Sequence, residues 1–158
     1  MVSSQKMQLK KPLKLFHVLV NNNCEVRKMK KIMIVDDDQN IIQTLKQSLE
    51  YMDADYKVTC TSNGMQCLEL LKNNEIPDLI LLDIMMPKMD GWETFKNLQE
   101  NPLWKNIPVF FLTARTDRVA KNAVDFLAVE YIQKPYDIED LKIRINKVLK
   151  NTGNIGKE

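Results

Sequence analysis

Histidine is almost missing from this chain, since His17 is the only one among 158 residues. From residue 30 onward, the sequence therefore excludes a histidine-based catalytic triad and a histidine-rich metal site. Cysteine is scarce as well: Cys24, Cys60 and Cys67 are odd in number and lack the spacing of a metal or redox motif. We expect Cys60 and Cys67 to be small core residues in a protein of the reducing cytoplasm.

Long hydrophobic runs are also missing. No stretch approaches the roughly 20 apolar residues that a membrane-spanning helix needs. The apolar segment 13–20 is interrupted by Lys14 and His17, and no small-residue cleavage site follows it, so it does not fit a signal peptide. We therefore expect no association with a membrane.

The net charge of +2 conceals two regions of opposite sign. Residues 1–30 have a balance of +6, whereas residues 31–158 have a balance of −4. The basic part lacks the interleaved aromatic residues and arginine pairs of a nucleic-acid-binding arm, so we expect no nucleic acid partner. We interpret residues 1–28 as a basic, disordered extension before a natural start at Met29, residues 29–151 as one domain, and residues 152–158 as a flexible tail.

Short apolar runs alternate with stretches of helical periodicity along the rest of the chain. Such runs are typical of buried strands in a parallel sheet. Five strand–helix units predict an α/β domain with helices on both faces of the sheet. The expected strands span 32–35, 56–59, 79–82, 109–112 and 131–133, and the expected helices span 39–51, 63–72, 92–100, 117–127 and 138–150. Apolar spacing predicts that the first helix turns inward Ile41, Leu45, Leu49 and Met52, and that the second turns inward Met65, Leu68 and either Leu71 or Leu70.

Four of the predicted strands end in polar residues suited to phosphoryl chemistry. These residues are Asp36-Asp37-Asp38, Asp83, Thr113 and Lys134. In an open parallel sheet, ligands bind outside the carboxyl ends of the strands, so all four groups are expected at one edge. Such a set can hold a divalent cation and a phosphoryl group together.

The aspartates have both a chemical and a plain structural interpretation. Asp36 and Asp37 repel each other unless a cation such as Mg²⁺ lies between them. Equally, an acidic run can cap the following helix, a role that we expect for Asp38. Asp83 can act as a nucleophile toward phosphorus and form an acyl phosphate, although an isolated aspartate after a strand is usually a turn residue.

Lys134 and Thr113 give the carboxylates a chemical context. The Lys134 ammonium can pair with Asp83 at rest and later with a phosphoryl oxygen, and Pro135 fixes the backbone after it. Thr113 offers a hydroxyl donor at the neighbouring strand end. Phosphoryl transfer needs mainly positioning and charge neutralisation, which these groups can supply. The alternatives are a helix cap for Thr113 and an ordinary exposed charge for Lys134.

Four stretches in order, IMIVDDD, PDLILLDIMMPKMDG, IPVFFLTA and YIQKPYD, resemble the receiver domain of two-component response regulators. The resemblance covers about residues 30–150 and implies a flavodoxin-like, five-stranded sheet of order 2-1-3-4-5. It implies that Asp83 is the phosphoacceptor and that Mg²⁺ or Mn²⁺ is bound directly by Asp37, through water by Asp36, and by the phosphoacceptor. The further implied residues are Met85 as a backbone-carbonyl metal ligand, Thr113 and Lys134 as phosphoryl contacts, and Thr113 with Tyr131 as the switch pair.

The resemblance also implies partners. A sensor histidine kinase or a histidine phosphotransfer protein would be the donor, because His17 lies outside the domain. The recipient of the signal would be a downstream protein or a second copy of this chain, and no output domain is expected within it. The family commonly signals through the fourth helix, the fifth strand and the last helix, where Ile143 lies opposite the core stripe. One departure affects this surface: the span from Thr113 to Lys134 is one residue shorter than usual, and Ala128-Val129-Glu130 stands where a glycine is common.

Three other functions fit the sequence less well. A Mg²⁺-dependent phosphatase with an aspartyl-phosphate intermediate needs an Asp-x-Asp-x-Thr/Val motif, but Asn40 stands at its last position. A flavodoxin-type FMN carrier needs a Ser/Thr-rich phosphate loop after the first strand, which is missing. A phosphorylation-independent interaction domain usually loses an acidic or lysine position, and none is lost here. We therefore expect a protein that catalyses reactions at its own aspartate and is not a dedicated enzyme.

Overall fold

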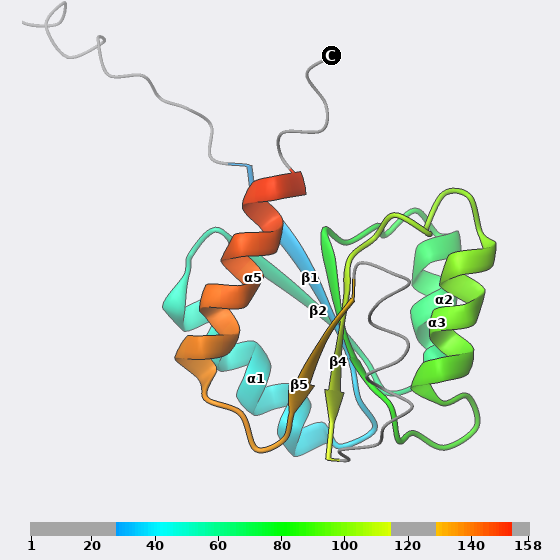
Figure 1. Ribbon diagram of the computed structural model, residues 1–158, viewed down its shortest axis with the longest axis horizontal. Coiled ribbons are helices and arrows are strands. Elements are labelled where there is room, and N and C mark those ends of the chain that lie inside the picture. Colours follow the sequence, from blue (N-terminus) through cyan, green and yellow to red (C-terminus); the bar gives the residue numbers. More distant parts are fainter. Residues whose placement is uncertain (1–27, 115–128, 153–158) are drawn as a thin grey trace, which may run out of the picture.

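A five-stranded parallel sheet forms the centre of the computed structural model, which describes residues 28–114 and 129–152 (Figure 1). Its order is β2-β1-β3-β4-β5, and every neighbouring pair is parallel. This is the predicted flavodoxin-like order. The strands are β1 (Lys30–Val35), β2 (Tyr56–Thr61), β3 (Leu79–Asp83), β4 (Val109–Thr113) and β5 (Val129–Gln133).

Helices cover both faces of the sheet, as predicted (Figure 1). On one face lie α1 (Gln39–Met52) and α5 (Ile138–Thr152), and on the other lie α2 (Gly64–Lys72) and α3 (Gly91–Glu100). Each described helix begins within two residues of its predicted start. The helix predicted for residues 117–127 lies outside the described residues, as do residues 1–27 of the predicted extension 1–28 and residues 153–158 of the predicted tail 152–158.

The alternating side chains of each central strand supply two separate hydrophobic cores. On β1, Ile32 and Ile34 pack toward α1 and α5, whereas Met33 and Val35 pack toward α2 and α3. Because both faces are covered, all four side chains are at most 1% exposed. Full burial of such a side chain stabilises a fold by about 1.5–3 kcal/mol relative to exposure. Continuous apolar runs therefore form strands here without polar alternation.

The inward faces of the first two helices differ from the sequence prediction. In α1 the buried side chains are Ile42, Leu45 and Leu49, while Ile41 lies at the margin of the stripe. In α2 the prediction for Met65 is wrong, because its side chain is 57% exposed. The buried stripe of α2 is Gly64, Cys67, Leu68 and Leu71, with the spacing i, i+3, i+4, i+7. The prediction is confirmed for Leu68 and for Leu71, one of the two alternatives. The other two residues of the stripe are small, so hydrophobic spacing alone did not reveal them.

The cysteine prediction is confirmed for the two cysteines within the described ranges. Cys67 is fully buried in the core beside α2 and α3, and burial raises the pKa of its thiol to about 12. Cys60 is half-buried against the other core, and both thiols are free. No helix within these ranges is long and apolar enough to cross a membrane.

Candidate functional site

An ammonium group joins two buried carboxylates at the carboxyl edge of the sheet. Asp36 follows β1 and Asp83 ends β3, and these strands are neighbours in the sheet with Val35 paired to Leu82. Lys134, which follows β5, donates from Nζ to Asp36 Oδ2 at 2.6 Å and to Asp83 Oδ1 at 2.8 Å. The predicted resting pair between Lys134 and Asp83 is confirmed. The second bond, to Asp36, was not predicted.

The backbone holds the other oxygen of each carboxylate. Asp36 Oδ1 accepts a hydrogen bond from Asp38 N at 2.9 Å, and Asp83 Oδ2 accepts one from Met85 N at 2.8 Å. Lys134 N in turn donates to the Thr113 carbonyl at 2.8 Å, and the Lys134–Pro135 peptide bond is cis. Backbone groups in the turns at the ends of the strands therefore orient the charged side chains and restrict their rotation.

Negative charge is in excess at this site. Asp36 is 2% exposed and Asp83 is 6% exposed, and they share one cation. Burial raises the pKa of Asp83, and the charge of Asp36 adds to this rise, while the hydrogen bond and charge of Lys134 offset part of it. Burial alone would lower the pKa of Lys134, but its hydrogen bonds to the two carboxylates outweigh that effect and raise it. A lysine that remains charged thus faces two carboxylates, so a further cation would be favoured.

The remaining aspartates of the first loop have different positions. Asp38 caps α1, since its side chain accepts hydrogen bonds from Asn40 N at 2.8 Å and Ile41 N at 3.4 Å, as predicted. Asp37 lies exposed at the same strand end. Among the described residues, no three His, Cys, Asp or Glu side chains are grouped closely enough to hold a metal ion.

The donor types nevertheless suit Mg²⁺ or Mn²⁺. Both ions prefer carboxylate, carbonyl and water oxygens, which Asp36, Asp37, Asp83 and the Met85 carbonyl can offer. A divalent cation would also compensate the excess negative charge of the two buried carboxylates, which share one ammonium group. The metal ligand set stays a prediction.

A close contact behind Asp83 was not recognised in the sequence as part of the site. The loop after β3 returns so that Gly91 N donates to the Ile84 carbonyl at 3.0 Å. A Cβ atom at Gly91 would lie 2.3 Å from the Asp83 carbonyl oxygen and 2.8 Å from Ile84 Cα. Only glycine allows α3 to begin directly against the backbone of the phosphoacceptor candidate. Asp90 caps this helix through Glu93 N at 2.8 Å.

Thr113 and Tyr131 lie on the neighbouring strands β4 and β5, near the same edge of the sheet. Thr113 ends β4 and is buried, and Tyr131 pairs in register with Phe111, two residues earlier on β4. The Tyr131 ring stacks on the Phe111 ring, and their centroids are 5.2 Å apart. The ring of Trp92 in α3 lies 6.2 Å, centroid to centroid, from that of Tyr131. Burial raises the pKa of Tyr131 to about 12, and its hydroxyl has no hydrogen-bond partner in the described part of the chain. The sequence pattern did not reveal this aromatic cluster, because it depends on the pairing of β4 with β5.

Residues 32–146 match the family model of the response regulator receiver domain. The chain belongs to this family. Among curated relatives, it is 35% identical over 125 residues to the response regulator MprA of Mycobacterium sp. (strain KMS), covering 77% of this chain and 51% of that protein. It is 36% identical over 122 residues to the response regulator SaeR of Staphylococcus aureus (strain USA300), with the same coverage. The chain thus spans about half the length of these relatives.

Solved structures support the same assignment. The Francisella response regulator 1452 receiver domain has a TM-score of 0.69 and 31% identity, covering 78% of this chain and 98% of that one. A CheY-like receiver domain protein from Methanospirillum hungatei JF-1 has a TM-score of 0.71 and 28% identity, covering 81% and 99%. The receiver domain of a signal transduction histidine kinase from Syntrophus aciditrophicus has a TM-score of 0.69 and 29% identity, covering 82% and 95%.

Proposed function

We propose that this chain is a phosphorylation switch that accepts a phosphoryl group on Asp83 from a phosphohistidine of a sensor histidine kinase or histidine phosphotransfer protein. The observation that carries the proposal is the pairing of Lys134 with Asp83 and Asp36, all at the carboxyl edge of the sheet. The acceptor, a positive charge to stabilise the phosphoryl group, and a second carboxylate are then within reach of one another. Membership of the receiver family gives the same expectation.

The proposed reaction uses a carboxylate oxygen of Asp83 as the nucleophile. This oxygen forms a bond to phosphorus while the phosphorus–nitrogen bond of the donor breaks, and the imidazole nitrogen keeps the electron pair. Lys134, which divides its hydrogen bonds between two carboxylates at rest, then donates to a phosphoryl oxygen. The Thr113 hydroxyl donates to another. The chain acts on its own side chain and is not a dedicated enzyme.

Mg²⁺ or Mn²⁺ is the proposed cofactor. Asp36, Asp37, Asp83 and the Met85 carbonyl would hold it, and when bound it would neutralise charge on the phosphoryl oxygens. The support is the excess of buried negative charge around Lys134. Met85 N already donates to Asp83, so its own carbonyl lies on the same short loop.

The phosphodonor is proposed to dock beside this edge, over the groove between α1 and the loop before α5. The groove has a volume of about 580 Å³, and Ile41, Tyr136 and Ile138 are its exposed or half-buried apolar and aromatic residues. Tyr136 lies two residues after Lys134, so a protein in the groove would reach Asp83. Ile41→Glu should slow transfer from a phosphohistidine protein and leave phosphorylation by a small-molecule donor unchanged. Equal slowing with both donors would contradict docking at this groove.

The first test of the proposal is intact mass spectrometry with a small-molecule phosphodonor and Mg²⁺. The wild-type chain should gain the mass of one phosphoryl group, and Asp83→Asn should gain none. Asp38→Asn is the matched control. Asparagine is as good a helix cap as aspartate, and Asp38 lies at the same carboxyl edge of the sheet as Asp83. An Asp83→Asn variant that is phosphorylated at the wild-type rate would contradict the proposal.

The output is proposed to pass from Thr113 through Tyr131 to the surface of β5 and α5. If Thr113 moves toward a phosphoryl oxygen, it leaves space that the adjacent Tyr131 can fill. On α5, Ile143 is 66% exposed and can anchor a downstream protein or a second copy of this chain. Ile143→Glu should weaken phosphorylation-dependent association, while Leu103→Glu, at a site 82% exposed on another surface, should not. Unchanged association of Ile143→Glu would exclude Ile143 as the anchor.

A further inference from the structure

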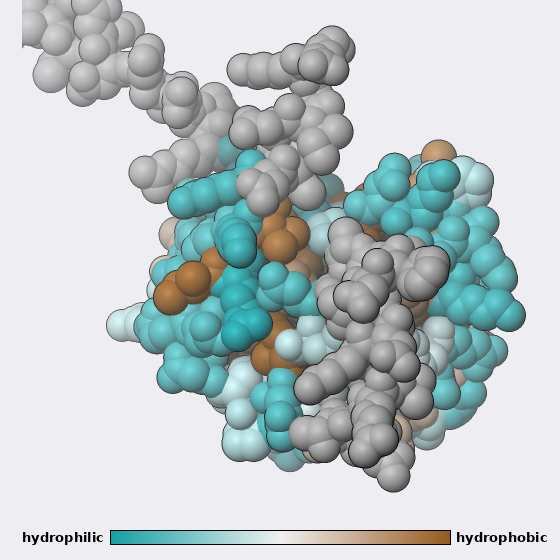
Figure 2. Space-filling view, viewed as in Figure 1, coloured by the Kyte–Doolittle hydropathy of each residue, from teal (hydrophilic) through white to brown (hydrophobic). Residues whose placement is uncertain are grey.

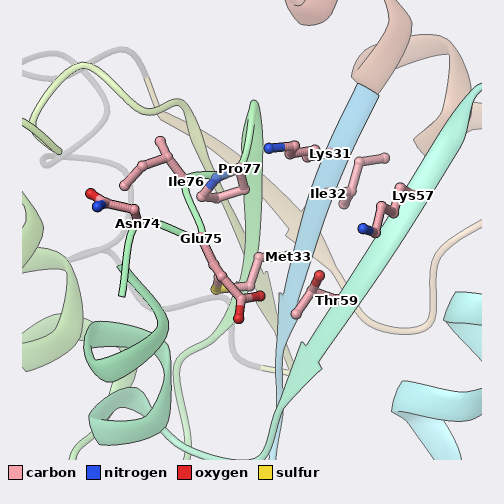
Figure 3. A pocket seen from close by; sticks show the side chains of 9 residues that line it. All are labelled: Lys31, Ile32, Met33, Lys57, Thr59, Asn74, Glu75, Ile76 and Pro77. Atoms are coloured by element: carbon pink, nitrogen blue, oxygen red, sulfur yellow. The ribbon is translucent and has the colours of Figure 1, made fainter. Parts of the chain in front are cut away.

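A pocket of about 300 Å³ opens at the amino edge of the sheet, the opposite end from Asp83 (Figure 3). One wall comes from the first residues of β1 and β2, and the other from the loop between α2 and β3. Lys31 in the pocket lies five positions before Asp36, a span of roughly 16 Å along a strand. The pocket therefore has no part in the phosphoryl chemistry proposed above.

Two lysines from neighbouring strands share one wall of this pocket. Lys31 on β1 and Lys57 on β2 are partners in register, so their side chains leave the same face of the sheet. Paired residues on adjacent strands are about 5 Å apart, and like charges in such a pair destabilise it. Neither ammonium makes an ion pair or hydrogen bond with any residue in 28–114 or 129–152. An anion between them would remove the repulsion.

The opposite wall is held in place by backbone hydrogen bonds. Asp78 ties the loop to β1 in both directions, because Lys31 N donates to Asp78 Oδ2 at 2.8 Å and Asp78 N donates to the Lys31 carbonyl at 2.7 Å. At the other end of the loop, Asn74 N and Glu75 N donate to carbonyls of α2 at 3.1 and 3.0 Å. A wall fixed in this way loses little conformational entropy when a ligand binds.

The remaining lining restricts the chemistry of a ligand. Thr59, on the same face of β2 as Lys57, can donate a hydrogen bond from its hydroxyl. Ile76 and Pro77 give the loop wall an apolar surface, and Glu75 carries a negative charge on that side (Figure 3). A second anionic group on the ligand would be repelled by Glu75, so a single anionic head with a short apolar tail fits best.

We propose that this pocket binds a small organic ligand with a single anionic head group, with its carboxylate or phosphate head between Lys31 and Lys57 and its tail against Ile76 and Pro77. The head accepts hydrogen bonds from the two ammonium groups and from Thr59. Such a site gives the domain a small-molecule input at the edge of the sheet that the phosphodonor does not approach.

The test is a residue-resolved NMR titration of the full chain at constant ionic strength and without Mg²⁺. Butyrate and butyl phosphate are the two probes, since they share a tail and differ in their head, and n-butylammonium has the same tail with the opposite charge. Saturable amide shifts confined to Lys31, Lys57, Thr59, Asn74 and Glu75 are expected with at least one of the two anions. The anion that gives them identifies the head group.

Variants separate this site from general attraction of anions to lysine. Lys31→Gln combined with Lys57→Gln should weaken the binding at least about tenfold, as loss of charge-assisted hydrogen bonds predicts. Lys105→Gln, at an exposed lysine that does not line the pocket, should leave it unchanged. Asp83→Asn should also bind normally, so failure here and failure of the phosphorylation proposal are distinguishable. Absence of saturation with both anions, equal binding of butylammonium, or shifts mainly around Lys134 would overturn the proposal.

Discussion

Replacement of Lys134 by methionine should destabilise the domain strongly and make its stability depend on pH. Methionine keeps most of the aliphatic stem and removes the charge and the N–H donors of the ammonium, so packing losses stay small. The ammonium bonds to Asp36 at 2.6 Å and to Asp83 at 2.8 Å, and these carboxylates are 2% and 6% exposed. Without Lys134, two buried negative charges face each other with no partner from this side chain.

The expected cost follows from measurements on other buried ion pairs. Loss of one partner of a buried pair costs about 3–5 kcal/mol, because the other charge stays buried and uncompensated. Lys134 itself is 18% exposed, so water can replace part of its interaction. We therefore expect the lower end, about 3 kcal/mol, in the free energy of unfolding of Lys134→Met near neutral pH.

Acid should restore much of this loss. Burial and Asp36 already raise the pKa of Asp83, and removal of Lys134 would raise it further. A carboxyl group with a raised pKa binds its proton more tightly in the folded than in the unfolded state, so stability increases as pH falls through the interval between the two pKa values. Urea unfolding of Lys134→Met from about pH 8 to about pH 5 should show this gain, and the wild-type chain should show less.

A double-mutant cycle isolates the coupling. Asp83→Asn removes one of the two buried charges, so it should recover most of the stability that Lys134→Met loses. Asp38→Asn combined with Lys134→Met is the control, since Asp38 makes no bond to Lys134 and should recover nothing. If Lys134→Met unfolds like the wild-type chain at neutral pH, or if Asp38→Asn rescues it equally, the electrostatic account of the site is wrong.

Three further predictions concern the metal, the core of the site and the N-terminal segment. Asp37→Ala should abolish Mg²⁺-dependent phosphorylation without unfolding the domain, because this exposed carboxylate makes no hydrogen bond or ion pair with any residue in 28–114 or 129–152. Full activity of the wild-type chain in excess chelator would refute a metal role. Gly91→Ala should lower the free energy of unfolding, measured by chemical denaturation, by about 1–3 kcal/mol, because the added Cβ would lie 2.3 Å from the Asp83 carbonyl oxygen. An unchanged denaturation midpoint would show that α3 can shift to accept the Cβ. Removal of residues 1–28 should change the melting temperature by only a few degrees and leave phosphorylation intact, because a short segment of such high charge gains little by packing on the domain. A large decrease in melting temperature would reveal a specific role for the segment.

Much of the fold could be predicted because each strand carries its own signal. The apolar runs ending at Val35 and Leu82 are buried on both faces, so every residue in them is hydrophobic and the polar residue that follows marks the edge of the sheet. The strand order came from the family resemblance, since apolar runs alone do not say which strands are neighbours. The contact of Lys134 with Asp36 was missed even so, because strand order does not say which of the neighbouring carboxylates the Lys134 ammonium bonds.

Other features depend on close contacts that no pattern of residue types reveals. The missing side chain of Gly91 lets α3 approach the backbone of Asp83, a role that the sequence analysis did not assign to it. The Tyr131 ring stacks on Phe111 and lies near Trp92 because β4 and β5 pair in one particular register. At the surface, Figure 2 shows hydrophobic side chains among hydrophilic ones on the α5 side. Ile143 of α5 is 66% exposed, as expected.

Chemical location of the acyl phosphate is the most direct test of the central claim that Asp83 is the phosphoacceptor. After incubation with a phosphodonor and Mg²⁺, borohydride reduces an aspartyl phosphate to homoserine, and peptide mass spectrometry identifies the converted residue. The account predicts homoserine at residue 83 and nowhere else, and none when the phosphodonor is omitted. Conversion at Asp36 or Asp37, or no conversion in a chain that has gained phosphoryl mass, would contradict it.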